Sequence, residues 1–139
     1  MGKPVVYLRA DGDSEIGLGH VYRLLSLAEN LNGQFETVFI IREPSENLRK
    51  LILDYCSEIF TLRDYADPEE EVEFWSCKLL TGNEIVVLDG YNFNTDYQQK
   101  LVNECGALIC VDDIHSFHFL ADYIINVGME NTEGKYSAE

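Results

Sequence analysis

The sequence predicts an α/β protein built on a doubly wound, mostly parallel sheet. Six short apolar runs rich in β-branched residues recur along the 139-residue chain, and most lack the polar alternation of a half-exposed strand. Such runs are typical of parallel strands that are buried on both faces and covered by helices. The segments between them carry helical signals, so strand and helix alternate as in right-handed βαβ units. Together these observations predict a Rossmann-like three-layer sandwich.

The six predicted strands share their length and composition. Each has four or five residues, mostly Val, Ile, Leu and aromatic side chains, and in chain order they occupy residues 5–8, 37–41, 59–62, 85–88, 107–111 and 123–127. No internal repeat relates them.

Four helices are predicted between the strands. The first has an apolar stripe at helical spacing and ends at Asn32-Gly33; the stripe consists of Val21, Leu24, Leu25, Ala28 and Leu31. Ser45 is a suitable N-cap for the second helix. Asp67-Pro68 followed by three glutamates is a strong start for the third, because it combines a cap, a first-turn proline and acids at the positive end of the dipole. The fourth opens at 94–95 and is expected to run to about Cys105.

Length and charge bound the class of protein. The chain suffices for one domain, predicted at residues 1–127, whereas residues 128–139 lose all periodicity and are interpreted as a linker. Ten basic against 25 acidic residues give a formal net charge of −15, which argues against a nucleic-acid or anionic-membrane surface. No apolar run is long enough to span a bilayer or to form the core of a signal peptide. The four cysteines match no CxxC or zinc-ribbon spacing, so we expect reduced thiols in a cytoplasmic protein.

Polar residues follow three of the predicted strands, at the sheet edge where open α/β proteins bind ligands. The groups are Arg9, Asp11 and Asp13 with Gly17-Leu18-Gly19-His20; Asp89, Gly90 and Tyr91; and Asp112, Asp113, His115 and His118. We expect all three groups to converge on one crevice. The last group resembles no specific metal motif, although oxygen and imidazole ligands suit a divalent ion, and strand-end carboxylates often cap loop amides. No metal is therefore expected.

The Gly17-Leu18-Gly19-His20 turn lacks the third small residue of a dinucleotide fingerprint, because Tyr22 stands at that position. No P-loop motif is present either, so no nucleotide cofactor is expected. The turn places His20 in the first turn of a helix, where the dipole favours the neutral imidazole that a general base needs. The alternative is that His20 only caps the helix or packs on the loop. Arg23 shares its helix face and would hold an anion, orient a carboxylate or form a surface ion pair.

Three stretches carry the motifs of one enzyme family. The first has R-x-D at 9–11, I-G-x-G-H-x-x-R at 16–23 and L-A at 27–28; the second has an apolar-D-x-Y strand end at 87–91; the third has D-D at 112–113 and D-x-x-x-N at 122–126. The chain thereby resembles the N-terminal domain of the UDP-2,4-diacetamido-2,4,6-trideoxy-β-L-altropyranose hydrolases of pseudaminic acid biosynthesis. The match departs at Gly90, where many members carry histidine.

The resemblance implies the N-terminal half of a two-domain, glycosyltransferase-B-like enzyme, with UDP held chiefly by a C-terminal domain beyond the linker. His20 is implied as the catalytic base for hydrolysis of the UDP-sugar at its anomeric carbon. The implied substrate-binding positions are Arg9, Asp11, Gly17, Gly19, Arg23, Asp89, Tyr91, Asp112 and Asp113. Two alternatives stay open: the acceptor half of a UDP-sugar glycosyltransferase, and a non-catalytic sugar-nucleotide-binding module. We expect the isolated chain to be inactive.

Overall fold

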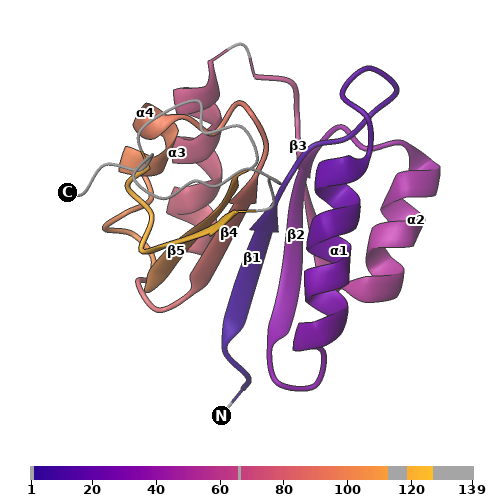
Figure 1. The fold of residues 1–139 in the computed structure, drawn as a ribbon, viewed down its shortest axis with the longest axis horizontal. Coiled ribbons are helices and arrows are strands. Elements are labelled where there is room, and N and C mark those ends of the chain that lie inside the picture. The colour runs from indigo at the N-terminus through magenta and orange to yellow at the C-terminus, as the bar shows by residue number, and fades with distance from the viewer. Residues whose placement is uncertain (1, 66, 113–118, 127–139) are drawn as a thin grey trace. The chain divides into compact units, whose positions relative to one another are not determined.

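The computed structural model describes residues 2–65, 67–112 and 119–126, which belong to two compact units, Met1–Asp64 and Tyr65–Glu139 (Figure 1). Both units alternate parallel strands with helices, so the predicted α/β class is confirmed. The predicted linker at 128–139 lies outside the described residues.

The first unit contains three parallel strands in the order β3-β2-β1. In chain order its elements are β1 (Val5–Arg9), α1 (Gly19–Leu31), β2 (Glu36–Arg42), α2 (Glu46–Tyr55) and β3 (Glu58–Leu62). Figure 1 shows α1 and α2 side by side along the strands. The central strand β2 is buried from residue 37 to residue 41, as expected for a strand covered on both faces.

Local signals in the sequence set the limits of the helices of this unit. The predicted stripe of α1 lies inward, with Val21, Leu24, Leu25 and Ala28 all buried. The helix ends where predicted, since Gly33 has a φ of +95°, a conformation that glycine adopts without strain. At the start of α2, the Ser45 hydroxyl accepts a hydrogen bond from the Leu48 amide at 3.2 Å.

The second unit contains three parallel strands in the order β4-β5-β6. Its elements are α3 (Pro68–Leu79), β4 (Ile85–Asp89), α4 (Thr95–Gln99), β5 (Ala107–Asp112) and β6 (Tyr123–Asn126). Asp67 caps α3 as predicted, accepting from the Glu69 amide at 2.9 Å. In each unit, strands that are neighbours in the chain are also neighbours in the sheet. This is the arrangement within each half of a doubly wound sheet.

The fourth helix is shorter than predicted. It ends at Gln99, because the amides of Lys100 and Leu101 bond to carbonyls three residues back, which tightens the chain into turns. The turns lead to Gly106, whose amide donates to the Glu84 carbonyl at 2.7 Å. A Cβ at Gly106 would lie 2.8 Å from the Asn83 carbonyl oxygen, so this close return of the chain to β4 requires glycine.

Helix length and thiol state both agree with the sequence. In the part of the chain that the structure describes, every helix is too short or too polar to cross a bilayer. All four cysteines are free thiols. Burial raises the pKa of Cys56 and of Cys105 to about 11, so both are overwhelmingly protonated at neutral pH.

Candidate functional site

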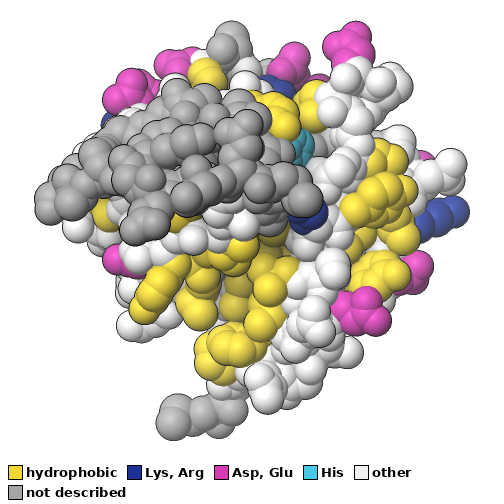
Figure 2. Space-filling model, in the orientation of Figure 1, with side chains coloured by type: hydrophobic (Ala, Val, Ile, Leu, Met, Phe, Trp, Pro, Cys, Tyr) yellow, Lys and Arg dark blue, Asp and Glu magenta, His cyan; other side chains and the backbone are white. Residues whose placement is uncertain are grey.

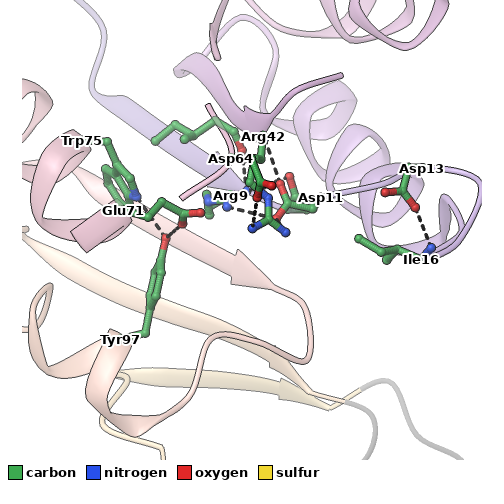
Figure 3. Close-up of polar contacts among 11 residues, drawn as sticks. Arg9, Asp11, Asp13, Ile16, Arg42, Asp64, Glu71, Trp75 and Tyr97 are labelled. Carbon is green, nitrogen blue, oxygen red and sulfur yellow. Dashed lines mark hydrogen bonds and ion pairs between the residues drawn. The ribbon is translucent and has the colours of Figure 1, made fainter. Parts of the chain in front are cut away.

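The loop at 10–18 joins β1 to α1 and folds around Asp13 (Figure 3). The Asp13 Oδ1 atom accepts hydrogen bonds from the amides of Glu15 at 2.8 Å and Ile16 at 2.7 Å. The Gly17 amide donates to the Asp13 carbonyl at 2.9 Å, and Gly17 has a φ of +84°. Asp13 therefore forms the turn, and Gly17 supplies the left-handed residue that the turn requires.

Arg9 and Asp11 form a two-point ion pair at the end of β1 (Figure 3). Arg9 is 1% exposed, and its Nη2 atom lies 3.0 Å from Asp11 Oδ2. The backbone amide of Arg42 donates to the same carboxylate at 2.9 Å. Burial alone would raise the pKa of Asp11, but the charge and hydrogen bonds of Arg9, with help from Arg42, hold it below its ordinary value. Both predicted binding residues thus have a structural role, and their contact with a substrate stays a prediction.

His20 is the second residue of α1 and is buried, at 8% exposure. It does not cap the helix, because Leu18 is the N-cap residue and no side chain bonds there. The Nη2 atom of Arg23 lies 2.9 Å from His20 Nδ1. A guanidinium only donates hydrogen bonds, so Nδ1 must be the acceptor, which places the proton of the neutral ring on Nε2. The prediction that His20 and Arg23 share a helix face is confirmed, whereas their direct contact was not predicted.

The predicted residues of the second unit follow β4 and β5. Asp89 ends β4 and is fully buried, and Tyr91 two residues later is 53% exposed. Because the register pairs Asp89 with Val111, Asp112 lies one position further along the same edge of the parallel pair. The candidate residues Asp113, His115 and His118 lie outside the described residues.

Gly90 owes its identity to the ring of Phe93. A Cβ at Gly90 would lie 2.8 Å from Phe93 Cε2, too close for any larger residue without movement of the ring. The ring also packs on Tyr97, with centroids 4.9 Å apart. Gln98 fixes the loop, since its side-chain amide donates to the Phe93 carbonyl at 3.0 Å and accepts from the Leu120 amide at 2.7 Å. A side chain at position 90 therefore requires the Phe93 ring to move.

Sequence reasoning missed a buried polar network in the second unit (Figure 3). The Tyr97 hydroxyl donates to Glu71 Oε2 at 2.6 Å, and Trp75 Nε1 donates to the Tyr97 oxygen at 3.0 Å. Glu71 is only 3% exposed. It belongs to the acidic run at the start of α3, and the one available signal was its position four residues before Trp75, on the same helix face.

The first unit also contains a pocket of about 590 Å³ that the sequence did not predict. It lies between the loop at 10–18, the exposed side of α1 and the start of α2. Asp13 and Tyr22 are among its lining residues, whereas His20 is not.

The structure brings together two pairs of the predicted residues in the first unit, Arg9 with Asp11 and His20 with Arg23. Convergence of the three groups on one crevice stays a prediction. Over residues 2–65, 67–112 and 119–126, no cluster of three His, Cys, Asp or Glu side chains is arranged to hold a metal ion. Because the strongest ligand candidates lie outside these ranges, the expectation of no metal stays a prediction as well.

Comparisons with known proteins add one relative. The chain is 28% identical over 133 residues to the uncharacterized protein MJ1062 of Methanocaldococcus jannaschii. The match covers 93% of this chain and 26% of the archaeal protein, so the chain spans about a quarter of that relative's length. No known protein family matches the chain. No solved structure matches it significantly.

Proposed function

We propose that this chain is the sugar-side half of an enzyme that hydrolyses a UDP-linked 2,4-diacetamido-2,4,6-trideoxy sugar at the anomeric carbon. The observation that supports the proposal is the 2.9 Å contact between His20 and Arg23, which joins the two polar side chains of the I-G-x-G-H-x-x-R motif at the head of α1. The glycine turn at 13–17 leads into the helix that carries this pair.

The proposed chemistry needs one base and little acid catalysis. UDP is a good leaving group, so positive charge near its phosphates helps more than protonation of the departing oxygen. Water attacks C1 from the face opposite UDP, the C1–O bond breaks with its electron pair going to UDP, and the proton of water passes to His20. The sugar is released with inverted configuration, because a single displacement occurs.

The tautomer of His20 decides when the base is available. The lone pair of the neutral ring is on Nδ1, which accepts the hydrogen bond of Arg23. Nδ1 takes a proton from water only after Arg23 has left it. The acetamido carbonyl oxygens of the bound sugar can accept the hydrogen bond of Arg23 in place of Nδ1, which frees the base.

The charge of the chain is consistent with a division of labour between two halves. A formal charge of −15 repels a pyrophosphate group, so the nucleotide needs cationic or amide donors from a further part of a longer protein. We therefore expect the 139-residue chain by itself to bind UDP more weakly than about 10 μM and to hydrolyse no UDP-sugar. Titration calorimetry with UDP tests this allocation; tighter binding would place the nucleotide site within this chain.

Replacement of the base tests the proposed reaction. In a native protein that contains this chain, His20→Ala should lower kcat by about two to four orders of magnitude and change KM little. Glu29→Gln, at the far end of α1, is the matched control and should leave kcat unchanged. Activity of His20→Ala within about threefold of wild type would remove His20 from the mechanism.

Product analysis separates the proposal from its alternatives. Free sugar and UDP in equal amounts indicate a hydrolase, whereas transfer of the sugar to an added acceptor indicates a glycosyltransferase with the same base. Stoichiometric binding of the sugar nucleotide without turnover would indicate a binding module.

A further inference from the structure

The pocket of the first unit has the size of a small-molecule site. Its volume of about 590 Å³ falls in the range of roughly 300 to 1,000 Å³ that ligand pockets occupy. Figure 2 shows apolar side chains gathered over α1 and α2, two of the elements that line the pocket. The lining comes from three segments that are distant in the sequence, the loop after β1, the first half of α1 and the start of α2.

The floor of the pocket is apolar. Leu18, Leu48 and Leu51 line it, together with the ring of Tyr22, which is 53% exposed. Tyr22 follows His20 by two residues, so it projects about 200° around the helix from His20. His20 does not line the pocket, although the pocket shares the loop at 10–18 with the proposed hydrolytic site.

The lining of the pocket includes two carboxylates, Asp13 and Glu43, and no basic side chain. Asp13 uses Oδ1 to accept the two amides of its turn, which leaves Oδ2 for a ligand. Glu43 is exposed, and its backbone is held in a left-handed conformation, φ +38°, by the bond from its amide to the Leu62 carbonyl at 2.9 Å. Within the described part of the chain, no Lys or Arg pairs with the Glu43 carboxylate.

Charge decides which class of ligand fits these walls. An anion would face two carboxylates with no cation beside it, and a neutral apolar molecule would remove water from both carboxylates without replacing it. An ammonium group neutralises them, while an apolar body covers the three leucines and the Tyr22 ring, whose face attracts cations. The formal charge of −15 also raises the local concentration of cations.

We propose that this pocket binds a small organic cation, namely a primary amine on a compact apolar body. The ammonium group lies between Asp13 and Glu43, and the hydrocarbon lies on Leu48, Leu51 and Tyr22.

A series of three probes of one shape tests the proposed class. The ¹⁵N-labelled 139-residue chain is titrated with pentylammonium, 1-pentanol and pentanoate, and amide shifts are followed by NMR. Pentylammonium should shift the signals of residues 12–18 and 43–51 saturably, with a Kd in the millimolar range. It should bind at least about fivefold more tightly than 1-pentanol, and pentanoate should not bind.

Variants locate the interaction. Glu43→Gln should weaken binding of pentylammonium about three- to fivefold and leave binding of 1-pentanol unchanged, because only the charge is lost. Tyr22→Ala should weaken both probes. Glu29→Gln, an equal loss of charge on α1 outside the pocket, is the control and should change neither.

Three results would overturn the proposal. Equal affinity for the amine and the alcohol would show that the two carboxylates do not attract the ammonium group. An effect of Glu29→Gln as large as that of Glu43→Gln would reduce the binding to diffuse attraction by an acidic surface. Absence of saturation below about 100 mM pentylammonium, or saturable binding of pentanoate in the pocket, would exclude the proposed ligand class.

Discussion

Three carboxylates that are largely shielded from solvent are held by different groups in the two units. In the first unit Asp11 lies against the Arg9 guanidinium, so a full charge faces a full charge. In the second unit Glu71 accepts from the Tyr97 hydroxyl, and Glu84 accepts from the Thr81 hydroxyl at 2.6 Å and from the amides of neighbouring residues. Each of these donors is a neutral hydroxyl or backbone amide.

Charged and uncharged partners differ in how much stability is lost when one partner is removed. Removing one member of a buried ion pair leaves a charge without compensation, which costs far more than the intact pair contributes. Removing one of several neutral donors costs roughly one hydrogen bond. Loss of Arg9 should therefore cost more than loss of any one hydroxyl that donates to Glu71 or Glu84.

The largest effect is expected for Arg9→Met. The substitution leaves Asp11 buried with only the Arg42 amide and the more distant Arg42 guanidinium, at 3.7 Å, and should lower the free energy of unfolding by about 3–5 kcal/mol. Urea unfolding followed by circular dichroism measures it. Arg9→Met with Asp11→Leu should recover part of the loss, since the orphaned charge is gone. A loss below about 1 kcal/mol for Arg9→Met would erase the distinction between the units.

A smaller effect is expected for Tyr97→Phe. The change deletes the hydroxyl that donates to Glu71 and accepts from Trp75, and should cost about 1–3 kcal/mol. Tyr123→Phe, at an exposed position of β6, is the matched control and should be neutral within about 0.5 kcal/mol. A cost equal to that of Arg9→Met would mean that neutral and charged partners are equivalent here.

The smallest loss of folding stability is expected when the pH is lowered and individual carboxylates become protonated. Asp11 and Glu84 both have a pKa below the ordinary values of 3.8 and 4.5: burial would raise each, but Arg9 outweighs it at Asp11, and bonds from Thr81 and Gly82 outweigh it at Glu84. Because the folded pKa is the lower one, their contribution is complete above about pH 5 and is lost as the pH falls through the folded pKa, by at most about 1.4 kcal/mol per pH unit for each group.

Single substitutions separate the two carboxylates in this acid loss. Urea midpoints between pH 5 and pH 2 should fall in the wild type, and the slope should flatten in Asp11→Asn and in Glu84→Gln. An unchanged slope in Asp11→Asn would show that Arg9 does not hold Asp11 ionised.

Much of the fold was predictable because its signals are local. A strand buried on both faces needs a run of apolar residues, which the sequence shows at β2 and β4, and a helix cap needs one side chain at one position, as at Ser45 and Asp67. The place of His20 followed in the same way from the glycine turn before it. The length of α4 did not, because it depends on where Gly106 must meet the chain before β4.

The partners of the polar residues were not predictable, since they lie far away in the sequence. Asp11 was expected to face a substrate, but the Arg42 amide that completes its shell is 31 residues away, and Tyr97 is 26 residues from Glu71. The pocket that Tyr22 helps to line is likewise formed by segments that meet only in the folded unit. The residue types indicated where polar side chains would gather, whereas tertiary packing determines which hydrogen-bond partners they have.

The collision between a Cβ at position 90 and the ring of Phe93 restricts the paths by which this protein can change. A side chain at position 90 and the ring at position 93 would occupy the same space. The cost of changing both positions therefore depends on which one changes first. A lineage that replaces Phe93 with a small residue first opens room for a side chain at 90. A lineage that changes Gly90 first must displace a ring that packs on Tyr97. We therefore expect a larger residue at position 90 to be tolerated better after Phe93 has become small.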